Sequence, residues 1–333
     1  MFMPTLLACL AWLALLPGCA GSASSTKGQP AAIVSPETAR GVPILRADGH
    51  QTTWEQLVAA AADADAVLVG ENHGHPLGLA AAAALWEDVL ARAPQAALAM
   101  EFIERDEQSR VDDYLMGVTD EATFRKRTNR TDSNYPPGHR TMVDAAKGAH
   151  RPVIAANAPR MYVRIARLEG YERLGTLTPE QRRLFRIPDV LPQPGSRYRD
   201  DFDKVMGANE GSDPAAPKPA GNRAAPTDPN AEADRRTKLD ATFRSQSVWD
   251  WTMAESVARG LEQGNAPVML VVGRFHVDFE GGLAQALNRL RPGTHTILVS
   301  FVDRDAPMTN GAASIRDEDR GRADYVIYVG PSH

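Results

Sequence analysis

Residues 66–73 read AVLVGENH, and residues 267–276 read PVMLVVGRFH. In each stretch a continuous apolar run ends in glycine, and a histidine (His73 or His276) follows three residues after that glycine. A run that is apolar at every position is typical of a strand buried on both faces of a parallel sheet. The two stretches therefore predict two interior strands, each followed by a polar turn.

Similar apolar runs occur elsewhere along the chain, at 96–100, 152–156, 296–302 and 324–329. Segments with helical patterning separate the runs, at 53–64, 77–92, 104–116, 139–149, about 234–263 and 281–290. Alternating strands and helices predict an α/β fold with a central, largely parallel sheet flanked by helices.

The overall composition narrows the class of protein. A chain of 333 residues, 43% hydrophobic and 24% charged, can bury a sizeable core, which excludes wholesale disorder and a collagen-like fibre. The net charge is −5, from 37 basic and 42 acidic residues. Because nucleic-acid-binding proteins usually carry a basic surplus, we expect no nucleic-acid partner.

The N-terminus predicts export. Residues 6–16, LLACLAWLALL, form an apolar core that is too short to span a bilayer and is typical of a signal peptide. The following Leu16-Pro17-Gly18-Cys19 resembles a bacterial lipobox. We therefore expect a lipoprotein: signal peptide 1–18 removed, Cys19 lipidated with palmitate, and the chain anchored to a membrane of the cell envelope. The outer membrane, facing the periplasm or the surface, is the expected location, and an ordinary secretory signal is the alternative.

The two cysteines, Cys9 and Cys19, restrict the chemistry. If the signal peptide is removed and Cys19 is acylated, the mature chain has no free thiol. Disulfides, thiolate zinc sites, iron–sulfur clusters and cysteine nucleophiles are then excluded together. Any metal or haem would have to be held by His, Tyr, Met, Asp or Glu.

The rest of the chain divides by composition. Residues 19–40 predict a flexible tether, and residues 41–333 predict the α/β domain, with a helical insertion or cap at about 158–250. Inside the cap, a stretch rich in Pro, Ala and Gly at about 207–232 predicts a disordered loop. Residues 160–199 hold nine Arg against four acidic residues, a local charge of +5. The rest of the chain must then carry a net charge of −10. This segment is either a face for an anionic ligand or the solvated side of amphipathic helices.

Polar residues follow several of the predicted strands. In an open α/β sheet, ligands bind beyond the C-terminal ends of the strands. The residues placed there are Glu71, His73, Glu101, Asn157, Arg160, Arg274 and His276. Their shared position predicts one polar site on that edge.

The two histidines suggest the chemistry of this site. His73 and His276 follow equivalent glycine turns, so adjacent strands would bring their imidazoles together. Neutral imidazole is both a metal ligand and a base near pH 7. With Glu101, the pair would suffice for a divalent metal with open coordination positions.

Simpler roles remain open for several of these residues. Glu71 could cap the following helix, and Asn157 could tie down a loop. Glu101 could form a salt bridge to Arg160 or Arg274, because a half-buried carboxylate needs a partner. His75, which precedes Pro76, is expected at the surface.

Five motifs occur in an order that resembles a known family. They are GENH at 70–73, AMEF at 99–102, ANAPR at 156–160, WDWTMA at 249–254 and VVGRFHV at 271–277. Together they are similar to the ChaN-like haem-binding uptake proteins of the Tiki superfamily, over about residues 50–330. That family includes bacterial lipoproteins tied to iron acquisition.

The resemblance implies haem binding, with a role in iron or haem uptake. Tyr or His would ligate the iron, and Arg side chains could pair with the propionates. The candidate ligands in the Arg-rich segment are Tyr162, Tyr171 and Tyr198. The candidate binding residues are Asn157, Arg160 and Arg274. A homodimer is left open.

The wider superfamily implies an alternative function. It includes erythromycin esterase-like hydrolases and Tiki-type metal-dependent proteases, in which His and Glu of matching turns carry catalysis. The matching positions here are Glu71, His73, Glu101 and His276, although Arg274 and Phe275 depart from the expected small or amide residues. The sequence leaves open whether the chain is an enzyme, a haem-binding protein or an envelope scaffold with a degenerate site.

Overall fold

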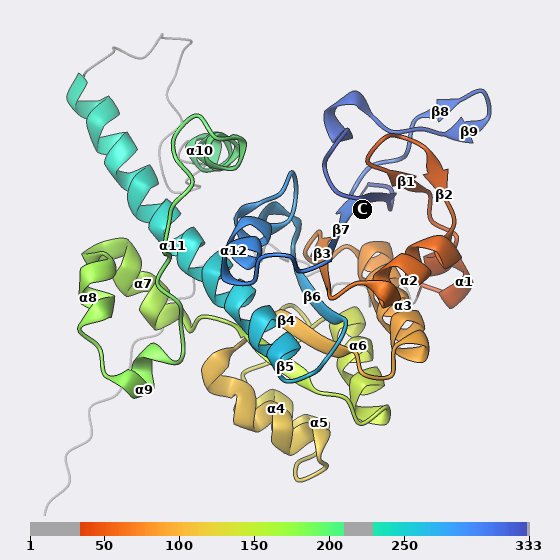
Figure 1. Cartoon of the computed structure of the whole chain (residues 1–333), viewed down its shortest axis with the longest axis horizontal. Helices are drawn as coiled ribbons and strands as arrows, with labels where there is room; N and C mark the ends of the chain where they lie inside the picture. Colours follow the sequence, from red (N-terminus) through yellow and green to blue (C-terminus); the bar gives the residue numbers. More distant parts are fainter. Residues whose placement is uncertain (1–33, 210–228, 332–333) are drawn as a thin grey trace, which may run out of the picture. The chain divides into compact units, whose positions relative to one another are not determined.

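An eight-stranded sheet forms the centre of the fold. In the computed structural model, which describes residues 34–209 and 229–331, its strand order is β2-β1-β10-β7-β3-β6-β4-β5 (Figure 1). The strands are β1 (Ile44–Arg46), β2 (Gln51–Thr52), β3 (Ala66–Glu71), β4 (Ala97–Glu104), β5 (Val153–Asn157), β6 (Val268–Gly273), β7 (Thr296–Val302) and β10 (Tyr325–Tyr328). The six strands from β10 to β5 are parallel, and β1 and β2 pair antiparallel at one edge. The two-stranded β8 (Met308–Thr309) and β9 (Ala312–Ala313) form a separate hairpin.

Helices cover both faces of the sheet. They are α1 (Pro36–Arg40), α2 (Trp54–Asp63), α3 (Pro76–Arg92), α4 (Gln108–Leu115), α5 (Glu121–Arg127), α6 (Pro137–Gly148), α7 (Arg160–Glu169), α8 (Tyr171–Gly175), α9 (Pro179–Arg182), α10 (Arg197–Asn209), α11 (Pro229–Glu262) and α12 (Gly282–Leu290). Short 3-10 helices are η1 (Arg105–Glu107), η2 (Arg274–His276) and η3 (Asp317–Asp319). The α/β fold with a mostly parallel central sheet is the predicted one.

The continuous apolar runs are explained by two apolar layers. Val67 and Val69 of β3 lie in the core that includes residues of α2, α3 and α6. Ala66 and Leu68 of the same strand lie in the opposite core, with residues of α11 and α12. Because successive side chains of a strand point to opposite faces, a strand between two helical layers must be apolar throughout.

The predicted elements correspond closely to the observed ones. Each of the six predicted strands is present, and residues 296–302 form β7 with the predicted bounds. The helix predicted at 104–116 is divided into η1 and α4. The short edge strands β1 and β2 were not predicted, since two or three residues show no recognisable period.

The predicted tether extends too far along the chain. The signal peptide, Cys19 and most of residues 19–40 lie outside the described residues, but the last five of them form α1. Ser35 caps this helix, and Ala39 packs into the core. Hydrogen bonds also hold this helix on the domain, because Asp88 of α3 accepts from Arg40 Nε at 2.8 Å and from Trp54 Nε1 at 2.7 Å.

The Arg-rich part of the chain is helical. Residues 160–209 contain α7 to α10, and α7 packs against the long helix α11. The loop predicted at about 207–232 lies mostly outside the described residues, with α10 extending to Asn209 and α11 starting at Pro229. Within residues 34–209 and 229–331, no helix combines the length and hydrophobicity that a membrane span requires.

One buried cation fixes α11 against the sheet. Arg105, just after β4, donates to Glu255 Oε2 at 2.8 Å, to the Thr252 carbonyl at 2.6 Å and to Ser256 Oγ at 3.0 Å. Burial lowers the pKa of Arg105 to about 10, so the side chain stays charged at neutral pH and needs all of these partners. The contact holds in place the helix segment that carries Asp250.

Asp88→Ala should lower the free energy of unfolding by about 1–3 kcal/mol, because the indole N–H of Trp54 and the guanidinium of Arg40 lose their acceptor. Urea denaturation measures the change. The matched control is Glu87→Ala, whose side chain is exposed and lies 3.6 Å from Arg40, and it should change stability by less than about 0.5 kcal/mol.

The hydrogen bonds of Asp88 also predict how the stability of the protein depends on pH. Hydrogen bonds from Arg40 and Trp54 lower the pKa of Asp88 below its usual value of 3.8. A carboxyl group with a lowered folded-state pKa contributes stability above the unfolded-state value and loses it as the pH falls through the folded-state pKa. The difference between wild type and Asp88→Ala should therefore be full at neutral pH and disappear in acid, and a constant difference would contradict the assignment.

Candidate functional site

Three adjacent strands place their polar residues on one edge of the sheet. β3 and β6 pair in parallel with Glu71 opposite Gly273, so the turns that follow them leave the sheet side by side. β4 pairs with the other side of β6 and contributes Glu101. Glu101 Oε2 accepts the backbone N–H of Gly273 at 2.7 Å, which ties β4 to the end of β6 at the site.

The first cluster is built around a buried carboxylate. Glu71 is 1% exposed; its Oε1 lies 3.2 Å from His73 Nδ1 and its Oε2 lies 2.9 Å from His139 Nε2. Burial alone would raise the pKa of Glu71, but the hydrogen bonds with His139 and His73 lower it below its usual value. Glu71 is therefore an ionised acceptor between two imidazoles, and it does not cap α3.

His73 is the accessible member of this cluster. Its side chain is 61% exposed, and the edge of its ring meets Phe102 with centroids 5.3 Å apart. A Cβ at position 273 would lie 2.9 Å from His73 Nε2, so the glycine there makes room for the imidazole. The hydrogen bond to Glu71 raises the pKa of His73 above its usual value, despite partial burial.

The second cluster surrounds a buried histidine. His276 Nδ1 lies 2.5 Å from Asp250 Oδ1, and its Nε2 lies 3.8 Å from Glu101 Oε1. Burial would lower the pKa of His276, but the charge and hydrogen bond of Asp250 raise it above the usual value, with help from Glu101. The second oxygen of Asp250 accepts the hydroxyl of Tyr198 at 2.7 Å, and Gln246 Nε2 donates to the same hydroxyl at 3.1 Å.

The predicted metal trio is not formed. His73, Glu101 and His276 influence one another electrostatically, but the described residues include no group of three or more His, Cys, Asp or Glu side chains arranged to hold a metal ion. The reason is that the carboxylates are already engaged: Glu101 with the Gly273 N–H, and Glu71 with two imidazoles. Within the described part of the chain, the three predicted side chains are therefore not arranged as a metal site.

The tyrosines do not suit the predicted role of iron ligand. All seven tyrosines of the sequence lie in the described ranges, and none is exposed. Tyr198 is 4% exposed with its hydroxyl engaged by Asp250 and Gln246, and burial raises its pKa well above the usual value, which disfavours the phenolate. Tyr162 is 7% exposed and packs on Phe185.

The predicted arginines occupy different environments. Arg160 is 89% exposed, with its Nε 3.6 Å from Glu104 Oε1. Arg274 lies 3.3 Å from Asp278 and 3.8 Å from Asp303. Neither forms the predicted salt bridge to Glu101, which is balanced by the Gly273 N–H and His276 instead.

Two further predicted residues have structural roles. Asn157 Oδ1 accepts the backbone N–H of Ala158 at 2.9 Å, which ties down the turn after β5. His75, expected at the surface, is buried: its Nδ1 accepts the Gly78 N–H and caps α3, and its Nε2 bonds the Gly330 carbonyl.

Three residues of the site escaped sequence reasoning. Asp250 lies within the WDWTMA motif at 249–254, which was noted without a role for its carboxylate. Gln246 lies one helical turn before it, and helix periodicity could have suggested the pair. His139 follows Pro136-Pro137-Gly138 at the start of α6, and no pattern in the sequence connects it to Glu71.

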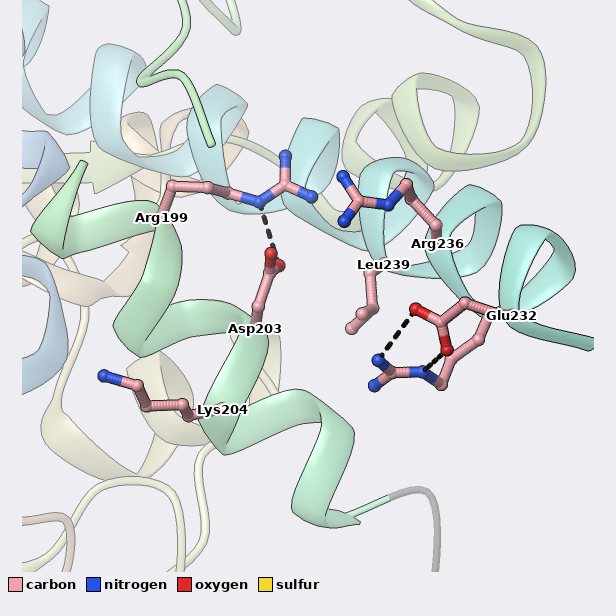
Figure 2. Close-up of a pocket in the computed structure, with 7 residues that line it drawn as sticks. Arg199, Asp203, Lys204, Glu232, Arg236 and Leu239 are labelled. Carbon is pink, nitrogen blue, oxygen red and sulfur yellow. Dashed lines mark hydrogen bonds and ion pairs between the residues drawn. The ribbon is translucent and has the colours of Figure 1, made fainter. Parts of the chain in front are cut away.

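One cavity of the described structure adjoins the His276 cluster, and another lies apart from both clusters. A small one of about 110 Å³ touches the Asp250 cluster and is lined by Ser247, Gly282 and apolar residues that include Leu191. A larger one of about 250 Å³ lies between α10 and the start of α11, apart from the sheet edge (Figure 2).

The chain is thus an α/β protein with carboxylate–histidine pairs at the C-terminal edge of its parallel strands. The family model for haem-binding uptake proteins of the Tiki superfamily, ChaN, matches residues 57–287, and the chain belongs to this family. Its predicted membership is thereby confirmed. No curated protein matches the chain.

Solved structures share the fold. A structure described as cofacial haem binding to ChaN of Campylobacter jejuni is 13% identical, with a TM-score of 0.60, and covers 86% of this chain and 96% of that one. A mutant of the erythromycin esterase EreC in its open conformation is also 13% identical, with a TM-score of 0.45, over 84% of this chain and 93% of that one. At this identity, the ChaN likeness establishes the fold alone.

Gly282→Ala should damage the His276 cluster. The added Cβ would lie 2.3 Å from Asp250 Oδ2 and 2.5 Å from Tyr198 Cε1, both held by hydrogen bonds. We expect a loss of about 1–3 kcal/mol in the free energy of unfolding, measured by urea denaturation. The control is Gly148→Ala at the end of α6, where nothing lies within 4 Å of the new Cβ; it should be neutral or stabilise by up to about 1 kcal/mol. Equal losses in both variants would contradict the close packing described.

Proposed function

We propose that this chain binds haem at the C-terminal edge of the sheet and that His73 would hold its iron. The observation that carries the proposal is a combination: the chain belongs to a haem-binding uptake family, and among the described tyrosines and histidines, His73 alone is both exposed and located at this edge. The other exposed histidines of the described ranges are His50, His150 and His295, which lie away from the strand ends that carry the site.

The chemistry of the donor set suits iron. Haem iron is commonly held by a histidine whose second ring nitrogen is bonded to a carboxylate or carbonyl, which fixes the tautomer and ring orientation. Here Glu71 engages His73 Nδ1, so Nε2 is the nitrogen that would bind a ligand. His139 holds Glu71 from the other side. When bound, haem would supply the iron chemistry, while these three residues position it.

Arg160 is the proposed partner for a haem propionate. Its guanidinium is 89% exposed at the end of β5, with a single ion pair to Glu104 at 3.6 Å. A charge-assisted Arg–carboxylate pair is stronger than a neutral hydrogen bond and is often bidentate. This assignment replaces the tyrosines by one histidine and keeps one of the predicted arginines.

We further propose that the mature protein is an envelope lipoprotein that serves haem or iron uptake. The support is the sequence LPGC at 16–19 together with the family membership. The expected result is that mass spectrometry of the purified protein finds an acylated N-terminal Cys19, and that Cys19→Ser moves the chain from the membrane fraction to the soluble fraction.

Hemin titration tests the ligand. Wild type should show a saturable Soret shift, and His73→Ala should weaken binding about tenfold or more, because the axial bond is lost. Gly273→Ala leaves every donor in place but pushes on the His73 ring, so it should shift the Soret band and weaken binding. The control, His295→Ala, removes an exposed histidine from elsewhere and should match wild type.

Two outcomes would contradict the assignment of His73 as the iron ligand. One is a His73→Ala variant that binds hemin as wild type does with an unchanged spectrum. The other is a Tyr198→Phe variant that alone abolishes the shift, which would return the ligand to the tyrosine. Absence of a saturable shift in wild type would reject haem binding itself.

A second candidate function, hydrolysis, is favoured by one observation. Asp250 lies 2.5 Å from His276 Nδ1, as in a base oriented by a carboxylate, and Nε2 faces Glu101. Assay against a panel of esters and peptides is the test. If an activity is found, Asp250→Asn should lower kcat by a factor of about 10²–10⁴ while His73→Ala retains activity. A wild-type protein inert across the panel, or an active Asp250→Asn, would remove this candidate.

A further inference from the structure

The larger cavity, of about 250 Å³, is lined mainly by charged groups of α10 and the first turns of α11 (Figure 2). Its bases are Arg199, Lys204, Arg235 and Arg236, and its acids are Asp203 and Glu232. Two further acids beside the lining, Asp201 and Asp240, bond Lys204 and Arg199, so the base that remains available to an anionic ligand is Arg236.

The acids of the lining are already committed to particular bases. Asp203 Oδ1 accepts from Arg199 Nε at 2.8 Å. Both oxygens of Glu232 accept from Arg235 at 3.1 Å. Lys204 Nζ donates to Asp201 Oδ1, just outside the lining, at 3.1 Å. Within the described residues, Arg236 is therefore the one base of the lining without a carboxylate at hydrogen-bond distance.

Arg236 interacts with Glu232 only through its charge, which helps to lower the pKa of that carboxyl. Its side chain is exposed, and within the described residues it makes no hydrogen bond or ion pair. Asp240, one helical turn further along α11, is bonded instead to Arg199. In Figure 2 the guanidinium groups of Arg199 and Arg236 point toward one another. Two like charges that face each other repel unless an anion lies between them.

Arg199 is a preorganised donor. Its side chain is only 6% exposed, and its guanidinium lies 4.6 Å from the centre of the Phe243 ring, above its face. Asp203 and Asp240 fix its orientation. The buried Leu239 closes the cavity below. A rigid guanidinium beside a free one forms a two-pronged site for tetrahedral or planar oxyanions.

The size and charge of the cavity indicate the class of ligand. About 250 Å³ is smaller than most drug-sized pockets and has room for a small organic ion rather than a single water. Arg236 would contact it beside Arg199, and a phosphate monoester carries a charge of about −1.5 to −2 at neutral pH with oxygens for both guanidinium groups.

This site is separate from the sheet edge. Arg236 precedes Asp250 by fourteen residues on the same helix, which corresponds to about 21 Å along the axis. We propose that the cavity between α10 and α11 is a binding site for the phosphate group of a small phosphate ester or of a lipid headgroup, with Arg236 as its principal free donor. The proposal does not depend on haem binding.

Calorimetric titration of the full chain with glycerol 3-phosphate tests the site. Wild type should bind it saturably, with an affinity that falls as NaCl is raised, because the donors are partly exposed. Arg236→Gln should weaken binding about tenfold or more, since a charge-assisted hydrogen bond is removed. The matched control is Arg167→Gln, an exposed arginine on α7 that does not line the cavity, and it should bind as wild type does.

Phosphatidylcholine vesicles with and without phosphatidic acid separate the two sources of phosphate. Sedimentation with the acidic vesicles only, lost in Arg236→Gln and accompanied by no binding of glycerol 3-phosphate, identifies a lipid headgroup. Binding of glycerol 3-phosphate identifies a soluble ester. The proposal is overturned if wild type binds neither probe, if Arg236→Gln binds as wild type does, or if succinate binds more tightly than the phosphate esters.

Discussion

The parallel pairing of β3 with β6 is the constraint on which the rest of the site depends. This register sets Glu71 opposite Gly273, so that two turns separated by some two hundred residues of chain emerge together. The absence of a side chain at 273 then lets the His73 ring lie against the β6 turn, and the Gly273 N–H binds Glu101 from the third strand. A slip of one residue would turn each of these side chains toward the opposite face, into an apolar layer.

The edge carries two carboxylate–histidine pairs that differ in exposure. Glu71 is buried and its partner His73 is open to solvent, which suits the binding of an external ligand. Asp250 and His276 are both buried, and their second contacts, to Tyr198 and Glu101, are internal. The same chemical pair thus occurs once with an exposed histidine and once with a buried one. This contrast is why we propose haem binding first and hydrolysis second.

Helix α11 connects the parts of the molecule that carry chemistry. Its central segment supplies Asp250 and Gln246 to the sheet edge, and Arg105 locks the next turns against β4. Its first turns supply Arg236 to the cavity shared with α10. One helix therefore carries both Asp250 and Arg236, which lie about 21 Å apart along its axis.

Much of the fold was accessible from the sequence, because a strand buried on two sides must be apolar throughout and helices between such strands must be amphipathic. The strand ends followed from the same pattern, and with them the placement of Glu71, His73, Glu101 and His276. The partners of those residues did not follow. His139 comes from α6 and Asp250 from α11, and a hydrogen bond between distant segments leaves no local period in the chain.

The sequence by itself determined the class of fold, the edge of the sheet that gathers polar groups, and the family. Only the tertiary structure decided which side chains are accessible to a ligand. It left no tyrosine exposed, engaged Glu101 of the predicted metal trio with the Gly273 N–H, and left His73 exposed at the strand ends. The physical reason is that apolar periodicity is a property of neighbouring residues, whereas burial and hydrogen-bond partnership depend on which distant segments meet.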